Sequence, residues 1–330
     1  MKHISIIVPR GDVIIDTIVA PYSLFRMANS CYKRLRGQEE DHFKVDLVGL
    51  DMEPVRYNGL FDVRPTKTIA EITRTDVVIV SAISGDLLAG IEQNRAYFPW
   101  ILKQRVEEGA EIASLCKGAF LLAETGLLNG KSCATHWTTH NIFRQRYPQV
   151  KLHPEKIISE DNGIYSSGGA YSFLNFLLYL IEKYCGRETA IWCSKVSEIE
   201  YDRLDQSHFI IFQGQKEHGD ELIRNAQAYI ESNYAEKLSI DAVANRFNVS
   251  PRSFLRRFKK ATANTPLEYL QRVKVEAAKK TLESTAHNIQ ETMYQVGYVD
   301  EKAFRNTFKK YTGLSPLEYR RKYNREMALV

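Results

Sequence analysis

The chain has 330 residues, 44% of them apolar, which is enough for two domains or three small ones with filled cores. Its net charge of +5 is unevenly spread. Residues 219–330 carry 20 lysines and arginines against 13 aspartates and glutamates, a charge of +7, while the rest of the chain sums to −2. Positive charge confined to the last third suggests an acidic partner for that region, although a solvated helical surface would show the same charge.

Five cysteines stand at positions 31, 116, 133, 185 and 193, and no two of them form a Cys-x-x-Cys pair. The sequence therefore indicates neither a zinc site nor a disulfide framework, and we expect no metal and no cofactor. The apolar run at the N-terminal end is too short for a signal peptide, and no window approaches a membrane span. These features predict a reduced protein of the cytoplasm that does not bind a membrane.

Short β-branched runs alternate with helical patterns in the first part of the chain. This alternation predicts an α/β domain of the flavodoxin-like kind, a mostly parallel sheet with helices on both faces, over residues 1–185. Strands are expected at 4–8, 43–50, 76–81 and 111–115, with another that begins near 162 and ends in a turn by 169. Helices are expected at 17–34, 96–108, 118–126 and 172–184.

Cys116 is the sharpest local feature of this domain, because a predicted strand runs into it and a helix follows almost at once. A residue at such a turn is expected to be exposed at the carboxyl edge of the sheet and to have a strained backbone. The helix N-terminus and the neighbouring Lys117 would both favour the thiolate. The position therefore predicts a nucleophile or the edge of a ligand pocket, whereas the other four cysteines are expected to be buried and structural.

Residues 186–219 are of mixed composition, and we interpret them as a connecting segment that ends in a polar linker. Beyond them, over residues 220–330, apolar residues recur at spacings of three and four. This spacing predicts an all-α domain.

Two segments of this helical region, 50 positions apart, are alike. Phe254 and Phe258 in the first match Phe304 and Phe308 in the second, and a Pro-Leu-Glu-Tyr tetrapeptide follows each pair. Phenylalanines four residues apart lie on one face of a helix and are expected in the core. A helical unit built twice, each copy with a basic face, indicates a protein that binds DNA at two places.

The first copy, about residues 238–260, has the layout of a helix-turn-helix. Asn248 is a good turn residue after a short helix, and Ser250 is a natural N-cap for the helix that follows. Arg252 and Arg256 lie four residues apart on a face away from the phenylalanines. Such a helix can enter a major groove, where arginine reads guanine edges with two hydrogen bonds.

The second copy, about residues 288–310, has the same frame, with Gly297 in the turn and Asp300 as the N-cap. One longer helix at 267–282 is expected between the copies and would fix their relative position. Two recognition helices held in one monomer could enter successive major grooves about one DNA turn apart. The side chains presented outward by the second copy are Lys302, Arg305 and Asn306.

Residues 220–322 resemble the DNA-binding domain of the AraC/XylS family of bacterial transcription regulators, through both helix-turn-helix units and both Pro-Leu-Glu-Tyr segments. The resemblance implies transcription control through tandem recognition helices. By this resemblance the base-reading positions are Arg252, Ser253 and Arg256 in the first unit and Glu301, Lys302 and Asn306 in the second. Asn306 stands where many members carry arginine, and asparagine reads adenine instead of guanine.

The whole chain is similar to the GlxA-type regulators, which join a PfpI-like, glutamine-amidotransferase-like domain to an AraC-type domain. This likeness rests on the Cys116 segment, on Thr135-His136-Trp137, on Arg203 and on His218-Gly-Asp220. It implies a nucleophile position at Cys116, an acidic position close to it at Asp16, and a pocket that also includes His136.

Two departures separate the chain from the hydrolytic members of that superfamily. Lys117 stands where those members place a histidine as base, and a stretch ending at Gly85 replaces the Pro-Gly-Gly turn that many of them carry. Because a cysteine without a placed base is a poor hydrolase site, we expect no catalysis. The candidate ligand-binding residues are Asp16, Gly85, Cys116, Lys117 and His136.

Our leading hypothesis is a sequence-specific transcription regulator of double-stranded DNA, controlled by a small-molecule effector bound at the Cys116 edge. A homodimer is expected, and RNA polymerase is a further candidate partner. The alternative is a cysteine-dependent hydrolase or hydratase, acting on amides, isonitriles or glyoxals, with a DNA-binding appendage. A third hypothesis is a redox sensor that uses Cys116.

Overall fold

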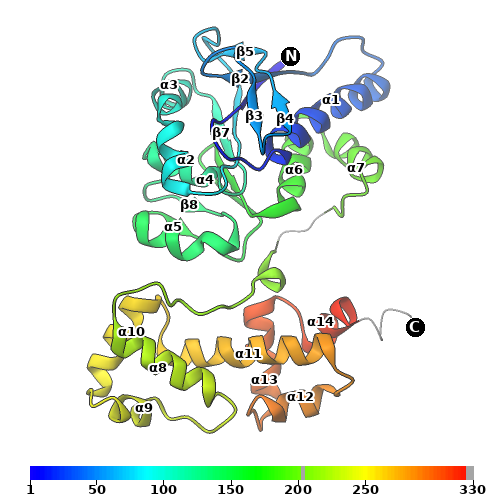
Figure 1. The fold of residues 1–330 in the computed structure, drawn as a ribbon. Coiled ribbons are helices and arrows are strands. Elements are labelled where there is room, and N and C mark those ends of the chain that lie inside the picture. Colours follow the sequence, from blue (N-terminus) through cyan, green and yellow to red (C-terminus); the bar gives the residue numbers. More distant parts are fainter. Residues whose placement is uncertain (202–204, 325–330) are drawn as a thin grey trace. The chain divides into compact units, whose positions relative to one another are not determined.

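The computed structural model describes residues 1–201 and 205–324 and divides the chain into two compact units, Met1–Gln206 and Ser207–Val330 (Figure 1). The first unit is α/β and the second is all-α, as the sequence predicts. Arg203, one of the residues that suggested the family, lies outside the described residues.

A seven-stranded sheet forms the centre of the first unit, in the order β10-β11-β7-β6-β1-β2-β5. All neighbouring strands are parallel except β10, which pairs antiparallel with β11. Strands β2, β1, β6, β7 and β11 give the order 2-1-3-4-5, which confirms the flavodoxin-like arrangement. The strands are β1 (Lys2–Ile7), β2 (Phe43–Gly49), β5 (Lys67–Thr68), β6 (Val77–Val80), β7 (Glu111–Ser114), β10 (Ile158–Asp161) and β11 (Ile164–Ser167).

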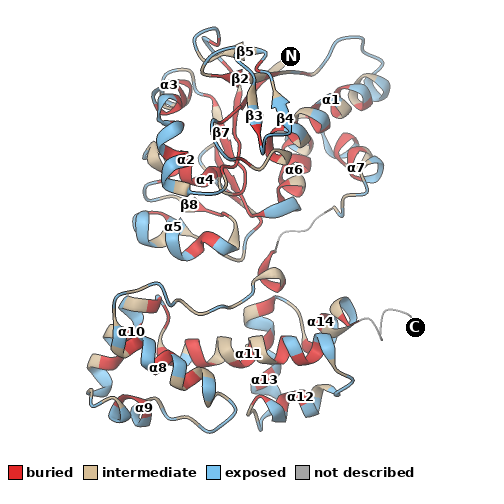
Figure 2. Cartoon of the chain, viewed as in Figure 1, coloured by how far each residue is buried: buried red, intermediate tan, exposed pale blue. Residues whose placement is uncertain are grey.

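Helices cover both faces of this sheet, because alternate strand residues face opposite sides and both sets are apolar. Ile4 and Ile6 belong to one core, with α1 (Asp16–Arg36), α6 (Phe173–Cys185) and α7 (Arg187–Val196). Ile7 and Val80 belong to the other, with α2 (Leu87–Gln93), α3 (Phe98–Val106), α4 (Gly118–Glu124) and α5 (His140–Arg146). Figure 2 shows the strands of the sheet largely buried between the two layers.

Shorter elements that the sequence did not reveal complete this unit. They are the hairpin β3 (Val55–Tyr57) and β4 (Phe61–Val63), the pair β8 (Ser132–Cys133) and β9 (Lys151–Leu152), and three 3-10 turns, η1 (Arg95–Tyr97), η2 (Trp137–Thr139) and η3 (Ala170–Ser172). A fourth 3-10 turn, η4 (Ser207–Phe209), begins the second unit.

The expected end of the first domain near Cys185 is too early. Helix α7 packs its buried Ala190 and Cys193 into the first core, so residues 186–206 belong to the α/β unit. The remaining residues of the expected connecting segment, 207–219, belong to the helical unit.

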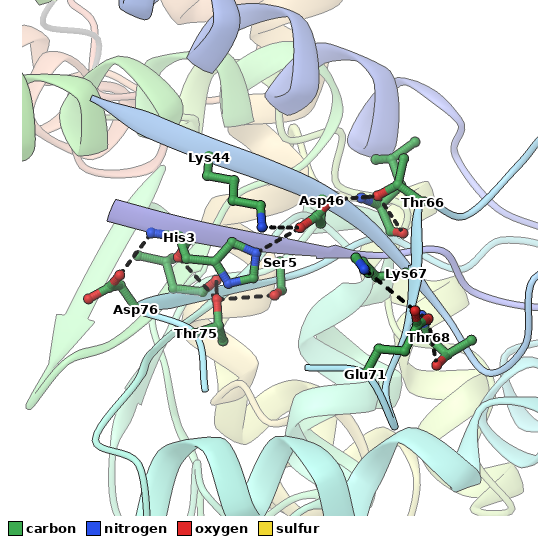
Figure 3. A network of polar contacts seen from close by, with 12 residues as sticks. His3, Ser5, Lys44, Asp46, Thr66, Lys67, Thr68, Glu71, Thr75 and Asp76 are labelled. Carbon is green, nitrogen blue, oxygen red and sulfur yellow. Dashed lines mark hydrogen bonds and ion pairs between the residues drawn. The ribbon is translucent and has the colours of Figure 1, made fainter. Parts of the chain in front are cut away.

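A polar network ties together the amino ends of β1 and β6 and the neighbouring β2 (Figure 3). His3 Nε2 lies 3.0 Å from the Asp46 carboxylate, and the backbone N–H of His3 donates to Asp76 at 2.8 Å. The Thr66 hydroxyl donates to the other Asp46 oxygen at 2.8 Å. This network fastens the end of the sheet opposite to the one at which Cys116 lies.

Besides η4, the second unit contains seven α-helices in the residues that the structure describes. Phe254 and Phe258 lie in one core, Phe304 and Phe308 lie in another, and α11 contributes to both. All four phenylalanines are fully buried, as predicted from their spacing. The helices are α8 (Glu221–Ser232), α9 (Ile240–Arg246), α10 (Pro251–Thr262), α11 (Pro266–Ser284), α12 (Ile289–Gln295), α13 (Glu301–Thr312) and α14 (Pro316–Tyr323).

Within residues 1–201 and 205–324, no helix is long and apolar enough to cross a membrane. Among the same residues, no three His, Cys, Asp or Glu side chains are grouped so that they could hold a metal ion.

Candidate functional site

The first helix-turn-helix consists of α9 and α10. Asn248 takes a left-handed conformation with φ of 52°, and the N–H of Val249 donates to the Ala244 carbonyl, so the turn closes α9 in a Schellman motif. Ser250 caps α10 by accepting from the N–H of Ser253, as predicted. The side chains predicted to read bases lie on the outer side of α10, with Arg252 and Arg256 exposed and Ser253 half-buried.

The second helix-turn-helix consists of α12 and α13. Gly297 has a φ of 73°, and Asp300 caps α13 by accepting from the N–H of Ala303 at 2.6 Å. The outward residues Glu301, Lys302, Arg305 and Asn306 are all exposed. Two of them hold each other, because the Arg305 guanidinium lies 2.7 Å from the Glu301 carboxylate one turn earlier.

The two turns differ in length by one residue. Helices α10 and α13 begin 50 residues apart, but α9 and α12 begin only 49 apart. The extra residue lies between Gly297 and Asp300, and Val299 of that turn is 88% exposed. The sequence repeat alone did not show this difference.

Lys274 and Gly297 form a contact, which we call the joint, that attaches the turn of the second helix-turn-helix to the rest of the helical unit. The buried Lys274 of α11 donates to the Gly297 carbonyl at 2.9 Å, and its ammonium lies 5.0 Å from the centre of the Tyr298 ring. Burial lowers the pKa of Lys274. A Cβ added at Gly297 would overlap the carbonyl oxygen of Ala235, which follows α8. The turn of the second helix-turn-helix therefore packs against the loop that precedes the first helix-turn-helix.

Each Pro-Leu-Glu-Tyr segment makes the same two attachments. Thr265 forms a capping box at the start of α11, as Ser315 does at the start of α14. The Tyr269 hydroxyl donates to Glu231 at 2.5 Å, and the Tyr319 hydroxyl donates to Glu283. The repeated tetrapeptide is thus a structural motif that anchors each unit to an earlier helix.

Residues 207–219, which we call the strap, lie along this unit, although the sequence suggested a linker. Lys279 donates to the Ile210 carbonyl at 2.7 Å, and the N–H of Phe212 donates to Glu276 at 3.1 Å. The donor Lys279 and the acceptor Glu276 both belong to α11. The strap is therefore part of the folded helical unit.

In the first unit, Cys116 lies in the sharp turn between β7 and α4, with φ of 53°. The predicted backbone strain is confirmed, because a non-glycine residue rarely adopts this conformation. The predicted exposure is wrong, since Cys116 is only 1% exposed. The reason is that the loop after β11 covers it, and the N–H of Cys116 donates to the Ser167 hydroxyl.

The predicted preference for thiolate is wrong as well. Burial raises the pKa of the Cys116 thiol, against a smaller opposing effect of the N–H groups of Ala170 and Lys117 and of the Lys117 ammonium. A buried thiol of this kind is a weak nucleophile. All five cysteines are buried free thiols, which confirms the expectation for the other four.

His136 lies beside this turn but is not placed as a base. Its Nδ1 accepts from the N–H of Thr138 at 3.1 Å. Burial, and to a lesser extent the charge of Lys117, lowers the pKa of His136 to about 4, so the ring is neutral near pH 7. No hydrogen bond joins this ring to Cys116 in the described residues.

The other two candidate pocket residues follow the carboxyl ends of neighbouring strands. Asp16 begins α1 and is half-buried, and Gly85, with φ of 62°, lies against Asp12. Within the described part of the chain, neither makes a hydrogen bond to Cys116. The structure thus brings Cys116, Lys117 and His136 together and places Asp16 and Gly85 on adjacent loops.

Gln206 is a site residue that the sequence did not reveal. Its buried side-chain amide donates to the carbonyls of Thr135, Pro154 and Lys156 at 3.0–3.2 Å, and its oxygen accepts from the N–H of Gly169. No local pattern marks it, because its partners lie 37 to 71 positions earlier. The next residue in the chain begins the strap.

The Gly168-Gly169 pair makes this packing close. A Cβ added at Gly168 would lie 2.8 Å from the Gln206 side-chain oxygen, and one added at Gly169 would overlap the His136 ring. Gln206 and His136 are therefore packed against the same backbone that covers Cys116.

Comparison with known proteins assigns a family to each unit. A helix-turn-helix domain family matches residues 243–322, and the DJ-1/PfpI family matches residues 24–183. The first unit is similar in fold to Drosophila melanogaster DJ-1beta, with a TM-score of 0.50 and 20% identity over 61% of this chain and 99% of that one. A THiJ/PfpI family protein from Pseudomonas syringae also has a TM-score of 0.50, with 17% identity over 70% and 86% of the two chains.

Curated relatives cover both units together. The transcriptional regulator GbdR of Pseudomonas aeruginosa is 25% identical over 280 residues, 84% of this chain and 73% of its own. The regulator CdhR of the same species is 25% identical over 80% and 77% of the two chains. Isonitrile hydratase of Pseudomonas putida matches only 44% of this chain, with 27% identity over 148 residues and 62% of its own length.

GbdR and CdhR, which match this chain across both units, are transcriptional regulators, and the described geometry of the second unit is a tandem helix-turn-helix with exposed basic faces. The chain is therefore a DNA-binding transcription regulator of the AraC type, with a DJ-1/PfpI-like N-terminal domain of the GlxA kind.

Proposed function

We propose that the N-terminal unit binds a small-molecule effector at the Cys116 edge of its sheet and that this binding controls how the helical unit engages DNA. The observation that carries the proposal is Gln206, which closes the backbone around Cys116 and is joined directly to the strap.

The topology supports a ligand at this edge. In open α/β sheets, ligands bind outside the carboxyl ends of the strands where the strand order reverses, which here is between β1 and β6. Asp16 and Gly85 follow β1 and β6, and Cys116 follows the next strand, β7. The half-buried Lys117 ammonium favours an effector that carries an anionic group.

The chemistry of the site supports sensing over turnover. Lys117 replaces the histidine that would serve as base, and the neutral His136 is already bonded to Thr138. The Cys116 thiol is buried and its pKa is raised. A hydrolase would need a thiolate with a base in reach, and a peroxide sensor would need an accessible thiolate.

Coupling to DNA follows from chain continuity. An effector that moved the 168–169 backbone or the Thr135 carbonyl would change the hydrogen bonds of Gln206. The strap begins at the next residue and is held by α11, which contributes to the cores of both helix-turn-helix units. The effector thereby has a physical route to the spacing of the recognition helices, provided that it prefers one arrangement.

On DNA, we infer that α10 and α13 enter successive major grooves and that a homodimer in the cytoplasm occupies repeated sites. Base readout falls to Arg252, Ser253 and Arg256 in the first half and to Lys302 and Asn306 in the second, with Glu301 and Arg305 holding each other. RNA polymerase is a further partner in this proposal.

The variants Lys117→Ala and Gln206→Met of the full-length protein test the proposal. Anionic metabolites are first screened for compounds that raise the unfolding temperature of the wild type and alter its affinity for a duplex selected from random DNA. We expect Lys117→Ala to lose both effects. We expect Gln206→Met to keep the stabilisation but lose the change in DNA affinity, while Gln38→Ala, at an exposed glutamine, keeps both.

A compound that acts equally on the wild type and on both variants would contradict this assignment of the site. The match to isonitrile hydratase keeps an enzyme as the second candidate. Cys116→Ser separates the two, because an enzyme would lose turnover of an isonitrile or amide, whereas a sensor would keep binding DNA.

A further inference from the structure

Val299 is an apolar side chain on the turn that leads into the second recognition helix, and it is 88% exposed. Its neighbours are fixed: Tyr298 packs on Phe304 at 5.5 Å between ring centres, and Asp300 caps α13. The joint of Lys274 and Gly297 holds the start of the same turn. Val299 is thus a side chain without apolar cover on a backbone that is held on both sides.

The first helix-turn-helix has no residue that corresponds to Val299. Its turn is one residue shorter, and the residue before the N-cap, Val249, packs against the first core. The second turn therefore has an extra residue whose side chain adds nothing to the fold. Its place on a fixed turn directly before the second recognition helix puts this side chain where it can contact an apolar group of bound DNA.

We propose that Val299 contacts the 5-methyl group of a thymine in the second half of the DNA site. The N-terminal residues of a recognition helix approach base edges in the major groove, and the thymine methyl is the apolar group that those edges present. The valine side chain has no group that can hydrogen-bond to a phosphate or to a polar base edge, so the methyl is its partner among the base edges.

The proposal deepens the DNA-binding function and agrees with a residue of the helix that follows this turn. Asn306 is exposed on α13, and asparagine reads adenine. Together these residues assign an A·T-containing second half-site, in contrast to a first half that Arg252 and Arg256 read at guanine.

The test replaces single thymines by deoxyuridine, which removes the methyl and keeps the pairing. The probe is the duplex that the full-length protein enriches from random DNA, with each thymine replaced in turn. We expect one position in the second half to weaken the wild-type protein about fourfold, the value of one buried methyl group. Val299→Ser should bind the original duplex with a similar loss and show no further loss at that deoxyuridine.

Val106→Ser is the matched control, because Val106 is 72% exposed at the end of α3 in the other unit. The affinity of the Val106→Ser protein should fall at the same deoxyuridine by the same factor as that of the wild type. If no second-half thymine is enriched, or if the losses from Val299→Ser and deoxyuridine multiply, Val299 does not read a thymine methyl and the proposal is wrong. A folded protein that enriches no sequence would instead overturn DNA recognition itself, so the two failures are distinguishable.

Discussion

The two helix-turn-helix units share their internal frame and differ on their outer faces. Both bury two phenylalanines four residues apart, close the first helix with a left-handed residue and cap the second with a side chain. Outside, α10 presents Arg252 and Arg256, whereas α13 presents an internal ion pair and Asn306. Packing restricts the buried positions, while the exposed ones are free to differ, which is how one fold can read two different half-sites.

The largest effects are expected where the shared frame is broken. Phe258→Ala and Phe308→Ala each remove a fully buried ring that packs on a tyrosine, at 5.3 and 5.4 Å between ring centres. We expect each variant to lose about 3–5 kcal/mol of stability. Hydrogen exchange should show the loss of protection centred on α9 and α10 for the first and on α12 and α13 for the second.

Phe61→Ala is the control, because Phe61 is exposed on the β3–β4 hairpin of the α/β unit. It should change stability by less than about 0.5 kcal/mol. If both core variants lose protection equally over all helices of the second unit, the two helix-turn-helix motifs fold as one. The comparison between the motifs would then apply only to their surfaces.

The turns should respond less strongly and unequally. Gly297→Ala places a side chain at a φ of 73° and against the Ala235 carbonyl, so we expect a loss of about 1–3 kcal/mol, mainly from strain. Asn248→Gly introduces a residue that also tolerates the φ of 52°, so we expect stability to change by less than about 1 kcal/mol. Thermal unfolding of the two variants measures the difference, and similar values would contradict the joint.

The outer faces should affect DNA and leave stability unchanged. Arg256→Ala and Asn306→Ala should each cost about 1–3 kcal/mol on the selected duplex and relax preference at a single base pair, a guanine for Arg256 and an adenine for Asn306. Affinity measured on a set of singly substituted duplexes checks both. Uniform weakening on all sequences would assign these residues to phosphate contact.

The local parts of this molecule could be predicted from its sequence. N-caps at Ser250 and Asp300 and the strained turn at Cys116 depend on neighbours within a few residues, and the structure has all three. The buried phenylalanine pairs followed from helical spacing in the same way.

Long-range packing could not be predicted. The burial of Cys116 comes from the segment that contains Ser167 and Ala170, more than fifty positions later, and this burial raises the pKa of its thiol although the N–H of Ala170 acts in the opposite direction. Gln206 is polar, lies in a stretch of mixed composition and acquires its role only through distant carbonyls. The strap has the polar composition of a linker, and its sequence does not show that its partners lie on α8, on α11 and in the loop after α10.

The most direct test of the central claim is selection of bound sequences from random duplex DNA with the full-length protein. Tandem recognition predicts an enriched motif with two dissimilar halves about one helical turn apart, the first containing guanine and the second rich in A·T pairs. A motif with a single half, or two identical halves within the span of one monomer, would contradict the assignment of α10 and α13 as two different readers.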